Sequence, residues 1–252
     1  MLRTRVIPVL LLRNKGLVKT VRFDKSKYIG DPINAVRLFN DKEVDELVFL
    51  DIDASVENRK PDFELIKNIA SECFMPLGYG GGITSFEDIA RLFAIGVEKV
   101  IINSTALLSL DLITQASEVY GDQSIVLCVD VQKNIWGKYQ VYSRKKAKHS
   151  RNDLITYIRE AQDAGAGEII INSVDHDGMM QGYDLGLIQK VVAATRVPVV
   201  ACGGAGSLVD LQKAVLAGAS GVAAGSLFIY HGPHKAVLIN YPTQNELKQL
   251  FA

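Results

Sequence analysis

The chain of 252 residues is long enough for one large α/β domain or for two smaller domains. Lys and Arg together number 28, as do Asp and Glu, and this charge balance gives no sign of a nucleic-acid partner. Apolar residues make up 48 % of the chain, but no apolar run reaches the roughly 18 residues of a membrane-spanning helix, so we expect no membrane partner either.

Short apolar runs alternate with amphipathic stretches along the whole chain. The runs are continuously apolar, which indicates parallel strands covered on both faces. Several helix starts are marked, by Asp31 before Pro32, by Ser85 before Asp88 and by Ser207. Eight such units in one domain favour a closed (βα)8 barrel, the TIM barrel, over an open sheet. In chain order the strand-like runs are RVIPVLLL, ELVFLDI, MPLGY, KVIINS, SIVLCVDV, EIIINSV, PVVACGG and GVAAGSLF.

The two halves of the chain resemble each other, and they align without a gap. Gly81 of the first half, for example, aligns with Gly203 of the second. The repeating unit is too long for a solenoid. We therefore expect a single barrel domain over 1–252, built from two duplicated half-barrels of about 1–122 and 123–252.

One stretch, 132–150, departs from this regularity. Two short runs about Gly137 have the pattern of a hairpin and lead into a cluster of basic residues. The stretch is either a solvated loop or a flap over an anionic ligand.

The cysteines point to the cellular compartment. Cys73, Cys128 and Cys202 are widely spaced and lie in or beside apolar runs, which is typical of buried thiols in a reducing environment. The first apolar run leads into the polar RNKG and has no small-residue cleavage site, so we do not interpret it as a signal peptide. We expect a cytoplasmic protein.

Glycines gather where four of the predicted strands end, on the face of a barrel that carries the chemistry. Glycine at a strand-to-helix turn lets backbone N–H groups approach an anion. The duplication supplies two such turns, and a ligand with a phosphate at each end would suit them, whereas tight turning alone is the other explanation. The residues predicted to bind phosphate are Gly81, Gly82, Asn103 and Ser104 in the first half, and Gly178, Gly203, Gly204, Gly225 and Ser226 in the second.

Strand alternation predicts which side chains point into the barrel. At the N-terminal end it places the two bases Arg5 and Lys99 beside the two acids Glu46 and Glu168. Four unpaired charges there would be costly, so we expect them to form a closed ring. Taken alone, such a ring is a stabilising network.

At the other end of the barrel, Asp130 ends a column of otherwise apolar inward residues. A buried carboxylate at that place is the natural general acid or base. Its counterpart at the end of the first strand, by strand order, is Leu11, which cannot carry a proton.

These motifs resemble the cyclase subunit of imidazole glycerol phosphate synthase over essentially the whole chain. The similar stretches are DELVFLDIDASVE, GGGI, INS, GAGEIIINSVDHDGMMQGYD and GGAGS. The resemblance implies a (βα)8 barrel with two phosphate sites and no metal or organic cofactor. It also implies that a glutaminase docks at the N-terminal face and that the charged ring is the gate of an ammonia tunnel through the barrel. Lys19, in the loop after the first strand, is also kept.

The chain departs from the family at one catalytic position. The family's reaction uses two aspartates, at the ends of strands one and five; Asp130 matches the second, but Leu11 occupies the first. Nearby polar positions are altered too, at Ile101, Asn172 and Cys202. Since one acid or base contributes about 10²- to 10⁴-fold, we expect a poor cyclase.

Together with the tail GSLFIYHGPHKAVLINYP, this departure resembles a divergent branch associated with surface-polysaccharide gene clusters. The resemblance implies a barrel that docks a glutaminase and passes ammonia to a separate amidotransferase acting on a sugar. Two alternatives remain: an active lyase of histidine biosynthesis, or a barrel that binds a phosphorylated metabolite without chemistry. His231 and His234 of the tail lack a third metal ligand, so we interpret them as loop residues.

Overall fold

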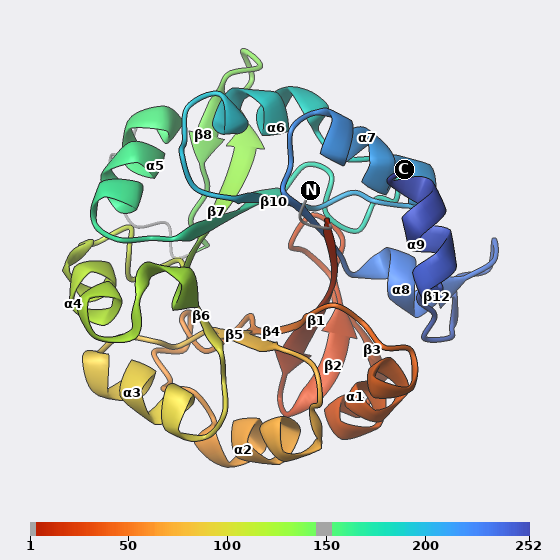
Figure 1. Ribbon diagram of the computed structural model, residues 1–252, viewed down its shortest axis with the longest axis horizontal. Coiled ribbons are helices and arrows are strands. Elements are labelled where there is room, and N and C mark those ends of the chain that lie inside the picture. The colour runs from red at the N-terminus through yellow and green to blue at the C-terminus, as the bar shows by residue number, and fades with distance from the viewer. Residues whose placement is uncertain (1–3, 145–152) are drawn as a thin grey trace.

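The computed structural model describes residues 4–144 and 153–252, which form a closed barrel of eight parallel strands ringed by helices (Figure 1). The last barrel strand pairs with the first, with Arg5 opposite Gly221, and this pairing closes the barrel. The predicted (βα)8 fold is confirmed. The barrel strands are β1 (Arg5–Arg13), β4 (Leu47–Asp51), β5 (Leu77–Gly80), β6 (Lys99–Ile102), β7 (Ile125–Lys133), β9 (Glu168–Ser173), β10 (Val199–Cys202) and β11 (Gly221–Ala224).

The helices begin where the sequence marks their starts. The Asp31 carboxylate accepts a hydrogen bond from the Asn34 backbone N–H at 2.9 Å, and Ser85 with Asp88 forms a capping box. These caps satisfy backbone donors that have no partner inside the helix. The helices are α1 (Pro32–Asp41), α2 (Phe63–Glu72), α3 (Phe86–Ala94), α4 (Asp111–Tyr120), α5 (Leu154–Asp163), α6 (Leu185–Val192), α7 (Leu208–Leu216), α8 (Ser226–Ile229) and α9 (Gln244–Leu250), with a short 3₁₀ turn η1 at Asp122–Ser124.

Short antiparallel strands extend the barrel at the C-terminal ends of two of its strands. β2 (Gly16–Lys19) and β3 (Lys27–Gly30) continue from β1. β8 (Tyr139–Val141) pairs with β7 through the hairpin turn predicted about Gly137, whose φ is +74°. The basic cluster that follows lies mostly outside the described residues, because these stop at 144 and resume at 153.

The tail after β11 contains a second small hairpin. β12 (Tyr230–His231) pairs with β13 (Ala236–Val237), and both predicted loop histidines, at 231 and 234, are exposed there. Within residues 4–144 and 153–252, no helix has the length and apolar character needed to cross a membrane.

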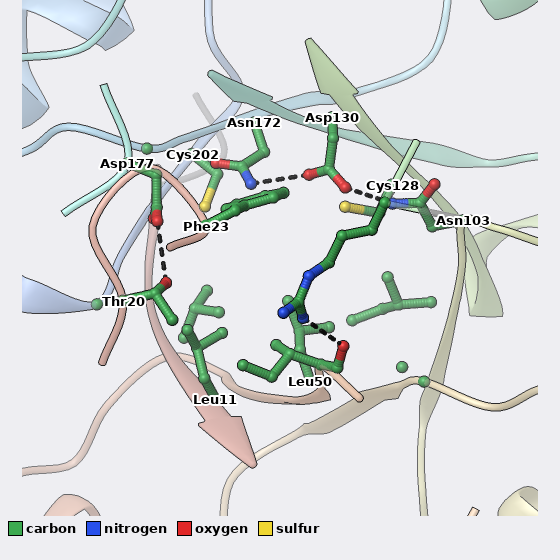
Figure 2. A pocket seen from close by; sticks show the side chains of 18 of the residues that line it. Leu11, Thr20, Phe23, Leu50, Asn103, Cys128, Asp130, Asn172, Asp177 and Cys202 are labelled. Carbon is green, nitrogen blue, oxygen red and sulfur yellow. Dashed lines mark hydrogen bonds between the residues drawn. The ribbon is translucent and has the colours of Figure 1, made fainter. Parts of the chain in front are cut away.

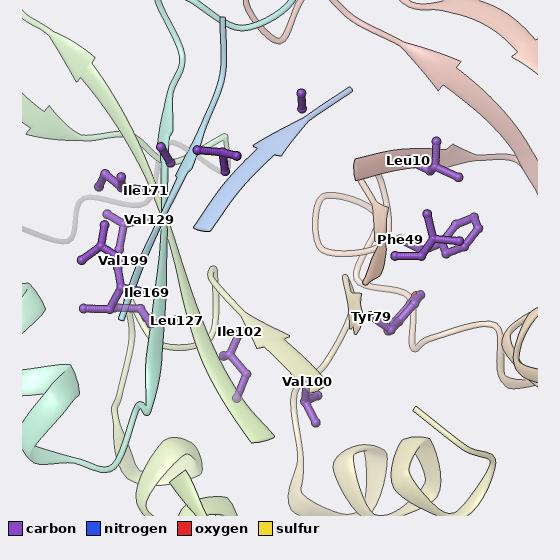
Figure 3. Packing of buried hydrophobic residues seen from close by; sticks show 14 of the residues in the cluster. Leu10, Phe49, Tyr79, Val100, Ile102, Leu127, Val129, Ile169, Ile171 and Val199 are labelled. Carbon is purple, nitrogen blue, oxygen red and sulfur yellow. The ribbon is translucent and has the colours of Figure 1, made fainter. Parts of the chain in front are cut away.

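The hydrophobic core has two layers, separated by the wall of strands. Figure 3 shows outward strand residues such as Leu10, Phe49 and Val129, which pack under the surrounding helices. The inner layer fills the barrel itself, as expected from strand alternation. Its members are Ile7, Val9, Val48, Ile101, Val126, Cys128, Ile170, Val200 and Ala223, with Leu11, Leu50 and Cys202 packed against them.

Corresponding positions of the two halves share local geometry. Ser207 and Asp210 form the same capping box as Ser85 and Asp88, and Gly81 and its counterpart both have positive φ. These likenesses support the duplication, which stays a prediction, as do the boundaries of the two halves.

Candidate active site

A single pocket at the C-terminal ends of the strands gathers the residues predicted to bind and react (Figure 2). Asp130 and Leu11 both line it, on β7 and β1. Lys19 lines it from the end of β2. The predicted phosphate-binding residues that line it are Gly81, Gly82, Asn103, Ser104, Gly178, Gly203, Gly204, Gly225 and Ser226.

The glycine turns are shaped by close packing of the backbone. A Cβ on Gly81 would lie 2.4 Å from the Asp51 carbonyl oxygen, and one on Gly204 would lie 2.2 Å from the Gly182 carbonyl oxygen. Both glycines also have positive φ, which other residues rarely adopt. Tight turning therefore suffices to explain these glycines, and phosphate binding by them stays a prediction.

Asp130 is held by two amide groups. Its carboxylate accepts a hydrogen bond from Asn103 Nδ2 at 2.7 Å and from Asn172 Nδ2 at 2.9 Å (Figure 2). Burial raises the pKa of Asp130 from 3.8 to about 6, although both hydrogen bonds favour the charged form. Such a carboxylate titrates just below neutral pH, where a general acid or base is most effective.

Both asparagines use their side-chain amides on Asp130. Asn103 directs its Nδ2 at the carboxylate, and phosphate binding by Asn103 stays a prediction. Asn172, one of the altered positions, supplies the second amide and keeps a buried Oδ1 that accepts no hydrogen bond from the described residues. Asn172 therefore contributes to the hold on Asp130.

The side of the pocket that carries Leu11 is apolar at its base. Leu11 and Leu50 line the pocket there and pack on the inner core (Figure 2). Ile101, a member of that core, also lines the pocket. Among the residues that the structure describes, no carboxylate takes the place of Leu11 on β1.

An acid that the sequence reasoning missed lies above Leu11. Asp177 lines the pocket from the loop after β9, and its carboxylate accepts a hydrogen bond from Thr20 Oγ1 at 3.2 Å (Figure 2). Burial raises the pKa of Asp177, and the nearby Lys19 opposes that rise. Asp177 belongs to the DHDG stretch, of which only Gly178 is predicted to bind phosphate. The acid directly before that glycine was the available signal in the sequence.

Lys19 is buried beside a glycine. Its Nζ donates to the Val9 carbonyl oxygen at 2.8 Å, and burial lowers its pKa from 10.5 to about 8. A Cβ on Gly225 would lie 1.9 Å from that Nζ. Gly225, whose φ is −108°, is thus required by the approach of the lysine and not by a left-handed turn, and phosphate binding by it stays a prediction.

A network of guanidinium groups and carboxylates borders the pocket at the loop after β4. Arg13 binds Asp53 with Nε and Nη2, at 2.5 and 2.8 Å. Arg144, from the segment after β8, also reaches Asp53, and Arg59 contacts Asp51. The sequence offered no pattern for this network, because its members come from three separate segments.

The N-terminal end of the barrel holds the predicted ring. Arg5 donates to both Glu46 and Glu168, and Lys99 Nζ lies 3.0 Å from a carboxylate oxygen of each. Each charge therefore meets two of the opposite sign, and both glutamates are buried. The geometry of a closed ring is as predicted; its role as a gate stays a prediction.

The inner apolar core lies between this ring and the pocket. Ile7, Val48 and Val126 belong to that core but do not line the pocket. In this conformation side chains fill the barrel interior, so a small molecule could pass from end to end only if they moved apart.

The structure describes no obvious place for a metal ion. Within residues 4–144 and 153–252, no three His, Cys, Asp or Glu side chains are grouped as metal ligands. The three cysteines are free thiols; Cys128 is buried as expected, whereas Cys73 and Cys202 are only partly buried.

The family model described as "Histidine biosynthesis protein" matches residues 5–235. The chain belongs to this family. It is 50 % identical over 251 residues to the "Putative imidazole glycerol phosphate synthase subunit hisF2" of Pseudomonas aeruginosa, an alignment that covers 98 % of this chain and 99 % of the relative. It is 39 % identical over 242 residues to the "Imidazole glycerol phosphate synthase subunit HisF" of Natranaerobius thermophilus, with 96 % of each chain covered.

These comparisons confirm the resemblance at the level of the histidine biosynthesis family and its synthase subunits. They extend over nearly the full length of both chains, so the whole barrel is compared and not one motif. The more specific expectation, a branch devoted to surface polysaccharides, stays a prediction.

Proposed function

We propose that this chain is the barrel subunit of a glutamine-dependent synthase of the imidazole glycerol phosphate synthase type, and that its pocket carries out the lyase reaction of histidine biosynthesis at a reduced rate. The observation that carries this proposal is Asp130, a buried carboxylate with a pKa of about 6 that faces the pocket. The names of the relatives support the same reaction class.

In this proposal the two glycine turns bind the two phosphates of an elongated substrate. Gly81 and Gly82 lie at one end of the pocket lining, and Gly203 and Gly204 belong to the equivalent turn of the second half. Backbone N–H groups at such turns bind phosphate without a side chain. Asp130 lies in the same pocket and would act on the central part of the substrate.

Asp130 would exchange protons with the substrate while ammonia adds. The two asparagine amides hold its carboxylate in one orientation, and a pKa of about 6 leaves it mostly ionised at neutral pH, ready to accept a proton. Leu11 offers no second group, so the other proton transfer depends on water or on Asp177. A missing acid or base costs about 10²- to 10⁴-fold in rate, which is roughly 3 to 5 kcal/mol of barrier.

Ammonia would enter from a glutaminase docked at the N-terminal face. The ring of Arg5, Glu46, Lys99 and Glu168 lies at that end, and the inner apolar core lies between the ring and the pocket. Neutral ammonia is small enough to move through an apolar interior when side chains part, whereas ammonium would have to shed its hydration.

A second candidate function follows from the apolar replacement at Leu11. If the lyase reaction is lost, ammonia that reaches the pocket is free to leave for a separate amidotransferase that amidates a surface-polysaccharide sugar. The apolar floor of Leu11, Leu50 and Ile101 favours this candidate, because it carries ammonia but gives no proton to a cyclisation.

Turnover with ammonia separates the two candidates. The purified protein is given the family's ribulosyl aminoimidazole-carboxamide substrate and an ammonium salt, alongside the variants Leu11→Asp and Asp130→Asn. A slow lyase predicts measurable turnover that rises about 10²-fold or more in Leu11→Asp and disappears in Asp130→Asn. No turnover in the native chain, with glutaminase activity still stimulated by it, would leave the amidation candidate as the function.

The gate is tested by reversing one charge of the ring. With a partner glutaminase present, Glu46→Lys should leave glutamine hydrolysis running while less ammonia reaches the product. If Glu46→Lys lowers only the thermal midpoint and leaves the ratio of product to hydrolysed glutamine unchanged, the ring is a structural network.

A further inference from the structure

Arg144 carries a guanidinium group into the pocket from the segment that follows β8. Its Nη1 donates to the Ile52 carbonyl oxygen at 2.9 Å and to Asp53 Oδ1 at 3.2 Å. Both acceptors belong to the loop after β4, so Arg144 crosses from one strand-end loop to another. This crossing fixes where its positive charge lies.

Much of the hydrogen-bonding capacity of Arg144 is unused. Among the described residues, neither Nε nor Nη2 of Arg144 has a hydrogen-bond partner, and its side chain is 34 % exposed. Asp53 already receives two hydrogen bonds from Arg13, so it is shared between two guanidinium groups. A guanidinium in that position has donors to offer to an anion.

The loop after β4, to which Arg144 donates its hydrogen bonds, packs directly on the first glycine turn. The Gly82 N–H points at Ser55 Oγ at 3.4 Å, and a Cβ on Gly82 would lie 3.1 Å from the Ala54 Cβ. Asp51 packs as closely on Gly81, where an added Cβ would lie 2.4 Å from the Asp51 carbonyl oxygen. Arg144 and the turn for which we propose phosphate binding therefore contact the same loop and line the same pocket.

That neighbourhood would repel an anion without Arg144. Asp51 at the end of β4 lines the pocket, and the acids Asp53 and Glu57 follow in the next loop. Arg59 pairs with both Asp51 and Glu57, and Arg13 and Arg144 both pair with Asp53, so three arginines face these three acids. Since a phosphate brings further negative charge, the balance matters most when the ligand is bound.

We propose that Arg144 is an anion-binding residue of the pocket and recognises the phosphate held at the Gly81–Gly82 turn. This inference rests on the phosphate-binding part of the proposed function. It adds a side chain to a site that is otherwise built from backbone N–H groups. The planar guanidinium binds phosphate through two parallel N–H donors, which an ammonium cannot reproduce. Apart from Arg144, no arginine is among the described residues that line the pocket, so the second turn, at Gly203–Gly204, would bind its phosphate differently.

The test measures binding of inorganic phosphate by isothermal titration calorimetry at fixed ionic strength. The variants are Arg144→Gln, Arg144→Lys and the control Arg22→Gln. Arg22 is an exposed arginine outside the pocket lining whose Nε also donates to a backbone carbonyl oxygen, that of Asp175, at 3.1 Å. The control therefore removes the same charge and a similar hydrogen bond.

We expect Arg144→Gln to raise the dissociation constant of one phosphate site tenfold or more, with Arg144→Lys intermediate and Arg22→Gln within twofold of the native chain. If the native chain binds phosphate and Arg144→Gln binds it equally well, or if Arg22→Gln loses as much, Arg144 is a tether between loops and this inference fails alone. If the native chain binds no phosphate, the phosphate sites of the proposed function fail with it.

Discussion

The two ends of the barrel use charge in opposite ways. At the N-terminal end Arg5 and Lys99 each contact both Glu46 and Glu168, so that all four charges are satisfied by one another. At the C-terminal end, no described residue of opposite charge is in direct contact with Asp130 or Lys19, and burial moves the pKa values of both toward neutrality. The first arrangement favours a fixed structure and the second favours proton transfer and ligand binding.

This difference shows that burial alone does not mark a functional group. Glu168 and Asp130 are both inward-facing carboxylates, one at each end of the strands. Glu168 meets two cations, whereas Asp130 meets two neutral amides. Burial raises the pKa of Asp130, and no cation in direct contact among the described residues offsets this rise, so the neighbours of a carboxylate must be considered together with its burial.

The largest expected effect comes from a substitution that breaks the ring. Glu168→Gln leaves Arg5 and Lys99 to share one carboxylate, and we expect the free energy of unfolding to fall by roughly 3 kcal/mol. Urea unfolding at pH 7 measures it. Asp163→Asn is the matched control, since it breaks the exposed pair with Arg196 and should cost less than about 0.5 kcal/mol. Equal losses in both variants would show that the ring is no more than a surface network.

The buried amine of Lys19 sharpens the contrast through pH. Its pKa is about 8 in the folded chain against an ordinary 10.5, so the unfolded chain holds this proton over a range in which the folded chain has lost it. Stability should therefore rise with pH from about 8 to 10.5, by roughly 3 kcal/mol from this group. The measurement is urea unfolding across that range, compared with Lys19→Met, in which the rise should be absent. A parallel rise in Lys19→Met would contradict the assignment.

Asp130 should have the opposite sign of pH dependence. The folded chain keeps this proton up to about pH 6, whereas an unfolded aspartate loses it near pH 3.8. Stability should therefore fall as pH rises from about 4 to 6, by roughly 2 to 3 kcal/mol from this group. Asp130→Asn should lack this fall when its unfolding is compared with that of the native chain. If both chains lose stability alike, the pocket does not hold a carboxylate of raised pKa.

The smallest effect concerns the space around Lys19. Gly225→Ala places a Cβ against the lysine amine, and we expect overpacking to cost about 1 to 2 kcal/mol. The same substitution in the Lys19→Met background should cost less, because a thioether end can move aside. A double-mutant cycle of thermal unfolding measures the coupling between the two positions. If the stability losses of the two substitutions are additive, a contact other than that with Lys19 requires glycine at position 225.

Much of the site was predictable because strand alternation obeys a local rule. Every second residue of a barrel strand points inward, and this rule places Arg5, Glu46, Lys99 and Glu168 inside the barrel. The ring then follows because the two bases pair with the two acids. Asp130 was found in the same way. The glycine turns were located correctly, although packing explains their glycines as well as a ligand does.

The missed residues lie in loops, where no periodicity applies. Asp177 meets Thr20 across 157 positions of sequence, and Arg144 reaches Asp53 from a segment 91 residues away. A loop side chain can point in many directions, and only the closed barrel determines which loops are neighbours. No spacing in the sequence carries that information.

The sequence by itself determined the eight strand and helix units, the charged ring and the apolar Leu11 at the end of the first strand, because each depends on residue identity and on the local periods of strands and helices. Tertiary structure alone decided which groups meet at the mouth of the pocket. Closure of β11 onto β1 brings the loops of both halves around one opening, and the burial that results moves the pKa values of Asp130, Asp177 and Lys19. A pKa depends on the water and charges that surround a group, and only the folded chain sets those.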